Sequence, residues 1–217
     1  AEVHFPDAGI FWYHPHQRAH IAQDLGMYGN IIVEPRDPDY YSPVNSEETL
    51  ILDDVLLDEG GWIPFGFEAP SHALMGRFGN VFLTNGEPGF RKEVKKGDVV
   101  RLFITDASNS RPFNLRIEGG VRMKLVAGDM GKFEREEWVP TVIIAPGQRD
   151  VVEARFEEEG DFALTNRITA IDHWMGEFRY EVDTLGVFSV SSDDTDEDYG
   201  AEFETLRTNA EVTAEFE

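Results

Sequence analysis

The sequence predicts an all-β protein, because apolar and polar residues alternate and turn signals recur at short intervals along most of its 217 residues. The clearest alternation is FNLRIEG, where Phe113, Leu115 and Ile117 fall on one face. Short strands at this spacing are typical of a β-sandwich or a β-barrel.

Four further segments are expected to form strands. In two of them the alternation defines a buried face, which contains Val100, Leu102 and Ile104 in VVRLFIT and Val152, Ala154 and Phe156 in VEARF. The segment TVIIAPGQRD (141–150) is predicted to be a buried strand that ends in a Pro-Gly turn. The period of EETLILDDVLLD (47–58) is ambiguous, but its spacing favours a strand.

The composition excludes several classes of partner and chemistry. The net charge of −23, from 42 acidic and 19 basic residues, makes nucleic acid and anionic membrane surfaces poor partners. An acid-rich chain with five lysines suits a halophilic protein, although an ordinary acidic protein is the alternative. The absence of cysteine excludes disulfides, thiolate nucleophiles and cysteine-bound metal in this chain. We expect no membrane span, and the first residues lack the features of a signal peptide.

Two boundaries divide the chain. Residues 34–48 contain three prolines and no apolar period, which indicates a linker. We therefore predict part of one domain at 1–35, a linker at 36–43, a complete β domain at 44–190 and an acidic connector with a short helix at 191–217. A segment of 35 residues cannot bury its own core, so we expect the chain to belong to a longer protein.

Three of the six histidines lie in IFWYHPHQRAH (10–20). In an extended strand Trp12, His14 and His16 share one face, and the two histidine Cα atoms are about 6.5–7 Å apart. Pro15 cannot donate to a strand ladder, so the strand is at an edge or ends here. Neutral imidazole suits copper, zinc and iron, and the spacing does not choose among them. The alternative is two ordinary histidines at a strand end.

The stretch PDAGIFWYHPHQRAHIAQDLGMYGNIIVEP resembles the second histidine motif of laccase-like multicopper oxidases. The segments MGRFGNVFLTNGEP, KKGDVVRLFITDASNSRPFNLRIEG, PGQRDVVEARF and LTNRITAIDHWMGEF follow in the order found in the middle domain of three-domain members. This resemblance implies cupredoxin-like Greek-key β-sandwiches. It also implies that the chain covers the end of a first domain and all of a second, and leads towards a third.

The resemblance implies that His14 and His16 are ligands of the type 3 copper pair, with Trp12 packed beside them. The type 1 and type 2 copper sites would need segments outside this chain, since a blue site requires a cysteine. The second domain would be free of copper, and its His173, Trp174 and Met175 could border the reducing-substrate pocket. His20 has no ligand role in the family pattern, His4 and His20 are expected at the surface, and His72 is expected in a loop of the second domain.

The implied parent protein oxidises phenolic or aromatic substrates, or metal ions, and reduces dioxygen to water at a trinuclear copper cluster. Its partners are a small reducing substrate, dioxygen and the remaining segments of the same enzyme, and it is secreted or lies in the cell envelope or periplasm. The 217-residue chain alone is expected to be inactive. One alternative is a copper-free cupredoxin scaffold that binds proteins. A copper-tolerance protein is less favoured, because the five methionines form no tract.

Overall fold

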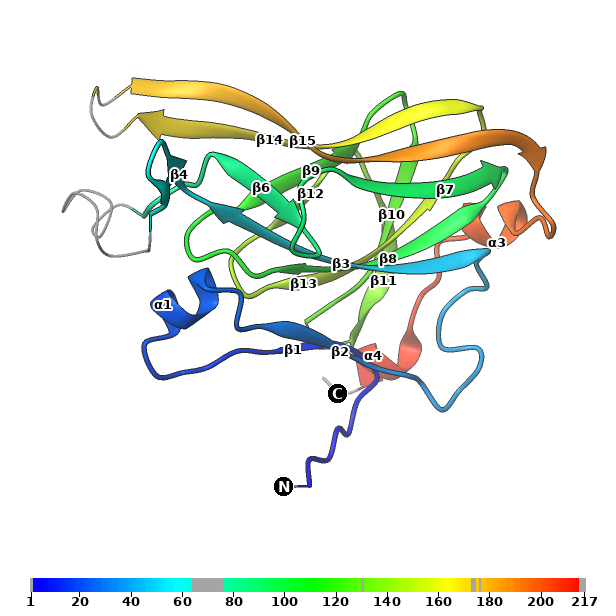
Figure 1. Ribbon diagram of the computed structural model, residues 1–217. Coiled ribbons are helices and arrows are strands. Elements are labelled where there is room, and N and C mark those ends of the chain that lie inside the picture. The colour runs from blue at the N-terminus through cyan, green and yellow to red at the C-terminus, as the bar shows by residue number, and fades with distance from the viewer. Residues whose placement is uncertain (1, 64–75, 130, 173–174, 176, 215–217) are drawn as a thin grey trace.

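Two facing β-sheets form most of the computed structural model, which describes residues 2–63, 76–129, 131–172, 175 and 177–214 (Figure 1). The six-stranded sheet has the order β11 (Gly131–Val139), β10 (Arg122–Gly128), β13 (Arg149–Arg155), β8 (Val99–Asp106), β3 (Ser46–Val55) and β6 (Val81–Thr84). The five-stranded sheet has the order β12 (Val142–Ile144), β9 (Phe113–Ile117), β14 (Gly160–Asp172), β15 (Glu177–Asp194) and β7 (Phe90–Lys96). Strands β3 and β8 pair in parallel, as do β15 and β7, and the other pairs within these two sheets are antiparallel. The predicted all-β class is confirmed.

The core lies between the two sheets and contains the faces that alternation predicts. Phe113, Leu115 and Ile117 of β9 are at most 1% exposed, and the predicted faces of β8 and β13 join the same cluster. The ring of Phe156 lies 5.0 Å from that of Phe188 across this core. Removing a large side chain from this apolar interior would cost much stability. The buried faces of β8, β9 and β13 therefore determine how the two sheets pack.

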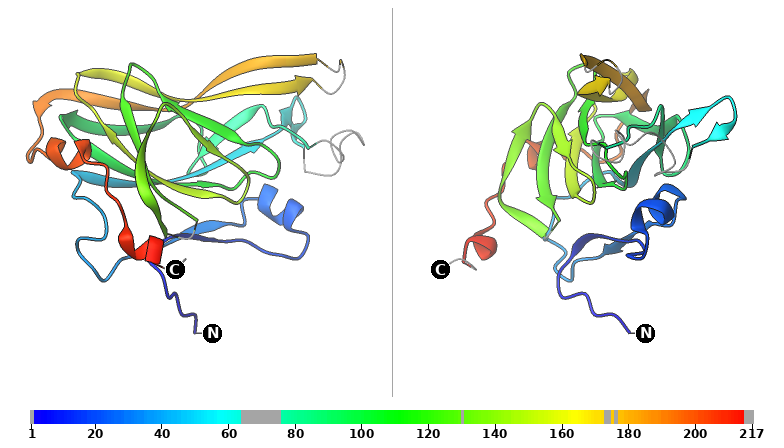
Figure 2. Two further views of the ribbon diagram at one scale, coloured as in Figure 1. Left: turned by 180° about the vertical axis from the view of Figure 1, so that it is seen from behind. Right: turned by 90° about the vertical axis from the view of Figure 1, so that its left-hand side faces the viewer.

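A second, smaller layer covers the outer face of the six-stranded sheet (Figure 2). It consists of the antiparallel pair β1 (Gly9–Tyr13) and β2 (Gly29–Val33), joined by a segment that contains α1 (Ala19–Asp24). Ile10 of β1 is fully buried in a cluster with Phe103 and Val151, so the first 35 residues use the larger sandwich as their core. A short hairpin, β4 (Leu57–Asp58) and β5 (Gly61–Trp62), follows β3. Within the described part of the chain, no helix is long and apolar enough to cross a membrane.

The prediction of a fully buried strand at 141–150 is wrong in one respect. Strand β12 covers only Val142–Ile144, and the side chain of Ile143 between them is 70% exposed. The physical reason is position, because β12 is the edge of the five-stranded sheet and only one of its faces meets the core. A continuous apolar run does not distinguish an edge strand from a central one.

The acidic C-terminal segment is less solvated than its composition predicts. Strand β15 continues to Asp194, four residues into the predicted connector, and the helices α3 (Gly200–Glu204) and α4 (Ala210–Ala214) follow. Phe203 of α3 is 1% exposed and packs on Trp138, with 5.0 Å between the ring centres. The segment is therefore anchored by an aromatic side chain that the surrounding acidic residues obscure in the sequence.

The proline-rich segment 34–45 forms no strand and arches over the outer face of the six-stranded sheet. Its Tyr41 and Ser42 are buried, and a cavity of about 630 Å³ lies between it and β8. Arg207, in the segment between α3 and α4, donates to the carbonyl oxygens of Asp39 and Tyr40. The C-terminal segment and the linker therefore hold each other in place.

Candidate metal centre

The histidine motif begins where strand β1 ends. Strands β1 and β2 pair from Gly9 opposite Val33 to Tyr13 opposite Gly29, so the ladder stops one residue before His14. The ring of Tyr13 lies over Gly29, and a Cβ at Gly29 would be 2.4 Å from the tyrosine oxygen. A larger residue at Gly29 would therefore require the exposed ring of Tyr13 to shift.

The side chains of Trp12, His14 and His16 form one continuous stack. The ring centres of Trp12 and His14 are 4.1 Å apart with 17° between the planes. Those of His14 and His16 are 4.6 Å apart with 34° between the planes. Tyr13 points away and is 57% exposed. The structure thus brings the three predicted site residues together on one side of the chain, at the end of β1.

The donor set of this stack suits a metal that accepts imidazole nitrogen. Among the described residues, Nδ1 of His14 is buried and has no hydrogen-bond partner, while His16 is exposed at the end of the stack. An unpartnered buried nitrogen is costly unless a proton donor or a metal satisfies it. The described residues contain no group of three or more His, Cys, Asp or Glu side chains that could hold a metal ion. The residues therefore fit copper as a pair of imidazole ligands, with further ligands needed from elsewhere.

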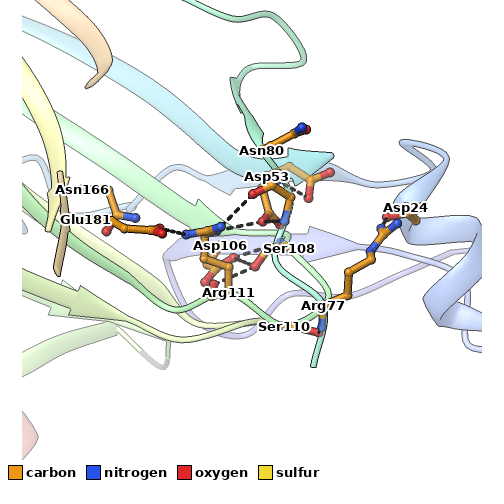
Figure 3. Close-up of polar contacts among 12 residues, drawn as sticks. Asp24, Asp53, Arg77, Asn80, Asp106, Ser108, Ser110, Arg111, Asn166 and Glu181 are labelled. Carbon is orange, nitrogen blue, oxygen red and sulfur yellow. Dashed lines mark hydrogen bonds and ion pairs between the residues drawn. The ribbon is translucent and has the colours of Figure 1, made fainter. Parts of the chain in front are cut away.

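The segment after the histidines is fixed to the larger sandwich by buried polar contacts. Gln23 and Asp24, at the end of α1, are 8% and 7% exposed. The carboxylate of Asp24 forms an ion pair with Arg77 (Figure 3). The hydroxyl of Tyr28 donates to Asp53 Oδ2 over 2.7 Å. The conformation of residues 14–28 thus depends on contacts with the larger sandwich.

A cluster of buried acids lies beside these contacts and was not predicted from the sequence (Figure 3). Burial raises the pKa of Asp53 to about 7 and that of Asp106 to about 8. Asp54 accepts a hydrogen bond of 2.7 Å from Nε of Arg111, which is 2% exposed. In the sequence, the one sign of this cluster is an acidic residue inside, or at the end of, an otherwise apolar strand. Strands with an exposed face have the same pattern, so it does not identify a buried acid.

The predicted substrate-pocket residues cannot be placed together. His173 and Trp174 lie outside the described residues, as does His72. Met175 is described and is 71% exposed. Phe178 and Tyr180, which follow on β15, are 73% and 65% exposed, so this end of the β14–β15 hairpin presents apolar side chains to solvent. His4 and His20 are exposed, as the sequence predicts.

The fold is shared with solved multicopper oxidases. That of Pseudomonas thermotolerans matches with a TM-score of 0.69 and 26% identity over 88% of this chain and 43% of that one. A multicopper oxidase from Campylobacter jejuni, described as a metallo-oxidase, matches with a TM-score of 0.71 and 25% identity over 86% of this chain and 39% of that one. The chain is similar to multicopper oxidases in fold and in sequence. No family model matches the sequence.

The curated relatives are cell division proteins. Cell division protein FtsP of Sodalis glossinidius is 30% identical over 166 residues, which are 73% of this chain and 34% of that protein. FtsP of Escherichia coli is 30% identical over 152 residues, which are 66% of this chain and 31% of that protein. The chain therefore spans about a third of the length of these curated relatives.

Proposed function

We propose that this chain provides two ligands of the type 3 copper pair of a laccase-like multicopper oxidase. The observation that carries the proposal is the stack of Trp12, His14 and His16, with an unpartnered imidazole nitrogen in it. The whole protein would oxidise phenolic or aromatic substrates, or metal ions, with dioxygen as the acceptor. Type 1 and type 2 copper would be held by residues outside this chain, because the chain has no cysteine and its described residues contain no group of three or more possible metal ligands.

The residues of the motif divide the work among them. His14 and His16 would each offer a neutral imidazole nitrogen, and stacking on Trp12 restricts the ring of His14 to one orientation. Pro15 limits the backbone between the two histidines. Copper bound there supplies the one-electron redox chemistry that reduces dioxygen to water. The larger sandwich supports this segment, and Met175, with His173 and Trp174, would border the pocket for the reducing substrate.

Removing either histidine should weaken copper binding to the chain at least tenfold. Two imidazoles make a modest site for divalent copper, so the wild-type chain should bind about one ion, without blue colour and without oxidising a dye. Binding should weaken on acidification, because only neutral imidazole binds metal. Calorimetric titration of His14→Ala and His16→Ala measures the loss, with the exposed His20→Ala as the control that should bind like the wild type.

In the whole protein, His14→Ala should abolish oxygen reduction and leave the blue colour intact, because the thiolate site lies elsewhere. If His14→Ala and His16→Ala bind copper as tightly as the wild-type chain, the assignment is wrong.

The second candidate is a copper-free cupredoxin scaffold that acts by binding proteins. It is favoured by the curated relatives, which are cell division proteins. The exposed apolar end of the β14–β15 hairpin would suit such a role. The copper titration separates the two candidates, since a scaffold has no need of a site and should bind no more copper than the His14→Ala variant. Either candidate would act outside the cytoplasm, in the cell envelope, the periplasm or the medium.

We also propose that the protein is adapted to high salt. At a net charge of −23 the folded chain repels itself, and salt screens exposed charges over about 10 Å at 0.1 M. The midpoint of thermal unfolding should therefore rise as potassium chloride increases from low to molar concentration. A midpoint that stays level or falls over this range would remove the argument.

A further inference from the structure

The helix that follows the histidines is too short to be stable alone. Helix α1 has six residues, no side-chain cap at its N-terminus and no acidic residue in its first turn. Isolated helices of this length are not populated in water, so tertiary contacts must hold α1 in place. Arg18, with a φ of 52°, turns the chain sharply from the histidine segment into the helix. Any movement of α1 is therefore transmitted to His16 through only two intervening residues.

Gln23 makes the central contact of α1 with the sandwich. Its side-chain amide donates to the carbonyl oxygen of Ala107 over 2.8 Å and to that of Ser108 over 3.2 Å. Both acceptors lie in the loop between β8 and β9 (residues 107–112) and are fully buried. Asn109 of the same loop donates to the carbonyl oxygen of His20 over 2.9 Å. The β8–β9 loop thus holds α1 at two points.

The β8–β9 loop is itself rigid, which makes it a suitable reference for the histidines. The backbone amide of Ser108 donates to Asp106 Oδ1 over 2.9 Å. The hydroxyl oxygen of Ser108 lies 2.7 Å from both Asp106 Oδ1 and the carbonyl oxygen of Arg111. Arg111 is in turn bound to Asp54 of β3 (Figure 3). These buried hydrogen bonds hold the loop in place, although Asp106 Oδ2 and Arg111 Nη1 have no hydrogen-bond partner among the described residues.

We propose that Gln23 is a positioning residue for His14 and His16, an inference that rests on the copper site proposed above. Gln23 touches neither histidine, and it acts by fixing α1 on the β8–β9 loop so that the two imidazoles stay side by side. Groups that hydrogen-bond directly to metal ligands typically change metal affinity by about 10–100-fold when they are replaced, and Gln23, which acts through α1, is expected at the lower end of that range. Asp24 contributes to the same docking, but its replacement would leave Arg77 without its buried carboxylate and would perturb folding.

The test compares two replacements of Gln23 with a matched control in the 217-residue chain. Gln23→Leu removes both hydrogen bonds and should weaken copper binding about tenfold at every pH. Gln23→Glu should bind like the wild type at pH 5.5, where a protonated carboxyl can donate to one carbonyl. It should bind about tenfold more weakly than the wild type at pH 8, where a carboxylate faces two carbonyl oxygens. Gln17→Glu adds the same charge at an exposed position and should weaken binding at neither pH.

A second readout needs no metal. In the wild-type chain the ring protons of His14 and His16 should show a nuclear Overhauser contact, because the ring centres are 4.6 Å apart. Gln23→Leu should lose this contact while the thermal transition of the sandwich remains cooperative. Wild-type copper affinity and an intact ring contact in a folded Gln23→Leu would overturn the proposal. If the wild-type chain binds no copper, the proposed function fails, and the ring contact alone decides the role of Gln23.

Discussion

Replacing Lys124 with methionine is expected to lower the free energy of unfolding by about 3–5 kcal/mol, because it takes the ammonium group away from buried Glu136 and leaves Glu153 with Arg101 alone. The side chain of Lys124 is fully buried on β10. Its Nζ lies 3.2 Å from Glu136 Oε2 and 3.0 Å from Glu153 Oε2, the latter without hydrogen-bond alignment. Both glutamates are at most 2% exposed, so water cannot replace the ammonium group.

The ion pairs of Lys124 are part of a charge ladder across the outer face of the six-stranded sheet. Lys124 of β10 lies opposite Glu153 of β13, which lies opposite Arg101 of β8, which lies opposite Glu47 of β3. Nη2 of Arg101 donates to Glu153 over 2.8 Å, and Nη1 donates to Glu47 over 2.7 Å. The alternation of sign along the register is what allows Lys124, Glu153 and Arg101 to be buried, since Glu153 lies between two cations.

Urea unfolding of Lys124→Met measures the expected loss, with Lys95→Met as the control. Lys95 pairs with the exposed Asp196, and its removal should hardly change the unfolding midpoint. The double variant Lys124→Met/Glu136→Gln should recover part of the loss, because one fewer buried charge is left unpaired. A Lys124→Met variant as stable as the wild type would mean that the carboxylates are solvated or protonated in the folded state.

The second large effect concerns pH. Asp106 is fully buried, and burial raises its pKa to about 8, with the charges of Asp54 and Asp53 acting in the same direction. The folded state therefore keeps a proton that the unfolded chain releases at the ordinary aspartate pKa of about 4. Because the folded state binds more protons in this window, stability is greatest at the acidic end and falls as pH rises towards 8. The slope for one such proton is about 1.4 kcal/mol per pH unit at most.

Asp106→Asn should remove the slope between pH 7 and 8, where Asp106 is the one of the three raised aspartates that still keeps its proton. The asparagine keeps an oxygen for Ser108 and carries no charge at any pH, so the variant should be more stable than the wild type at pH 8. Below pH 7 a slope should remain from Asp53 and Asp150, whose pKa values burial raises to about 7 and about 6. Urea unfolding at pH 5, 6, 7 and 8 at constant ionic strength measures how the free energy of unfolding depends on pH. The exposed Asp193→Asn should keep the wild-type slope, and an unchanged slope in Asp106→Asn would show that Asp106 is ionised in the folded state.

The sequence predicts the interior of this fold well, because strand periodicity reports which face is buried. The faces of β8, β9 and β13 follow directly from alternation. Position within a sheet is not encoded in this way, which is why Ile143 at an edge is exposed against expectation. Phe203 shows the converse, since one aromatic residue in an acidic run is buried by a partner distant in the sequence.

The candidate site was only partly predictable. Alternation along β1 and the extended residues after it places Trp12, His14 and His16 together, because the three residues are close in the sequence. Gln23 and Asp106 were missed, because their roles depend on acceptors and neighbours from other strands. A glutamine on a short helix and an aspartate after a strand are ordinary in any sequence, and their burial becomes visible only when the layers are assembled.

Copper-edge X-ray absorption on the copper-loaded chain tests most directly whether His14 and His16 are metal ligands. Bound imidazole produces outer-shell scattering that water and carboxylate ligands do not. We predict two imidazoles per copper in the wild-type chain, one in His14→Ala and one in His16→Ala, and the wild-type spectrum in His20→Ala. A wild-type spectrum without imidazole scattering, or one that persists unchanged in the double variant His14→Ala/His16→Ala, would contradict the proposed copper site.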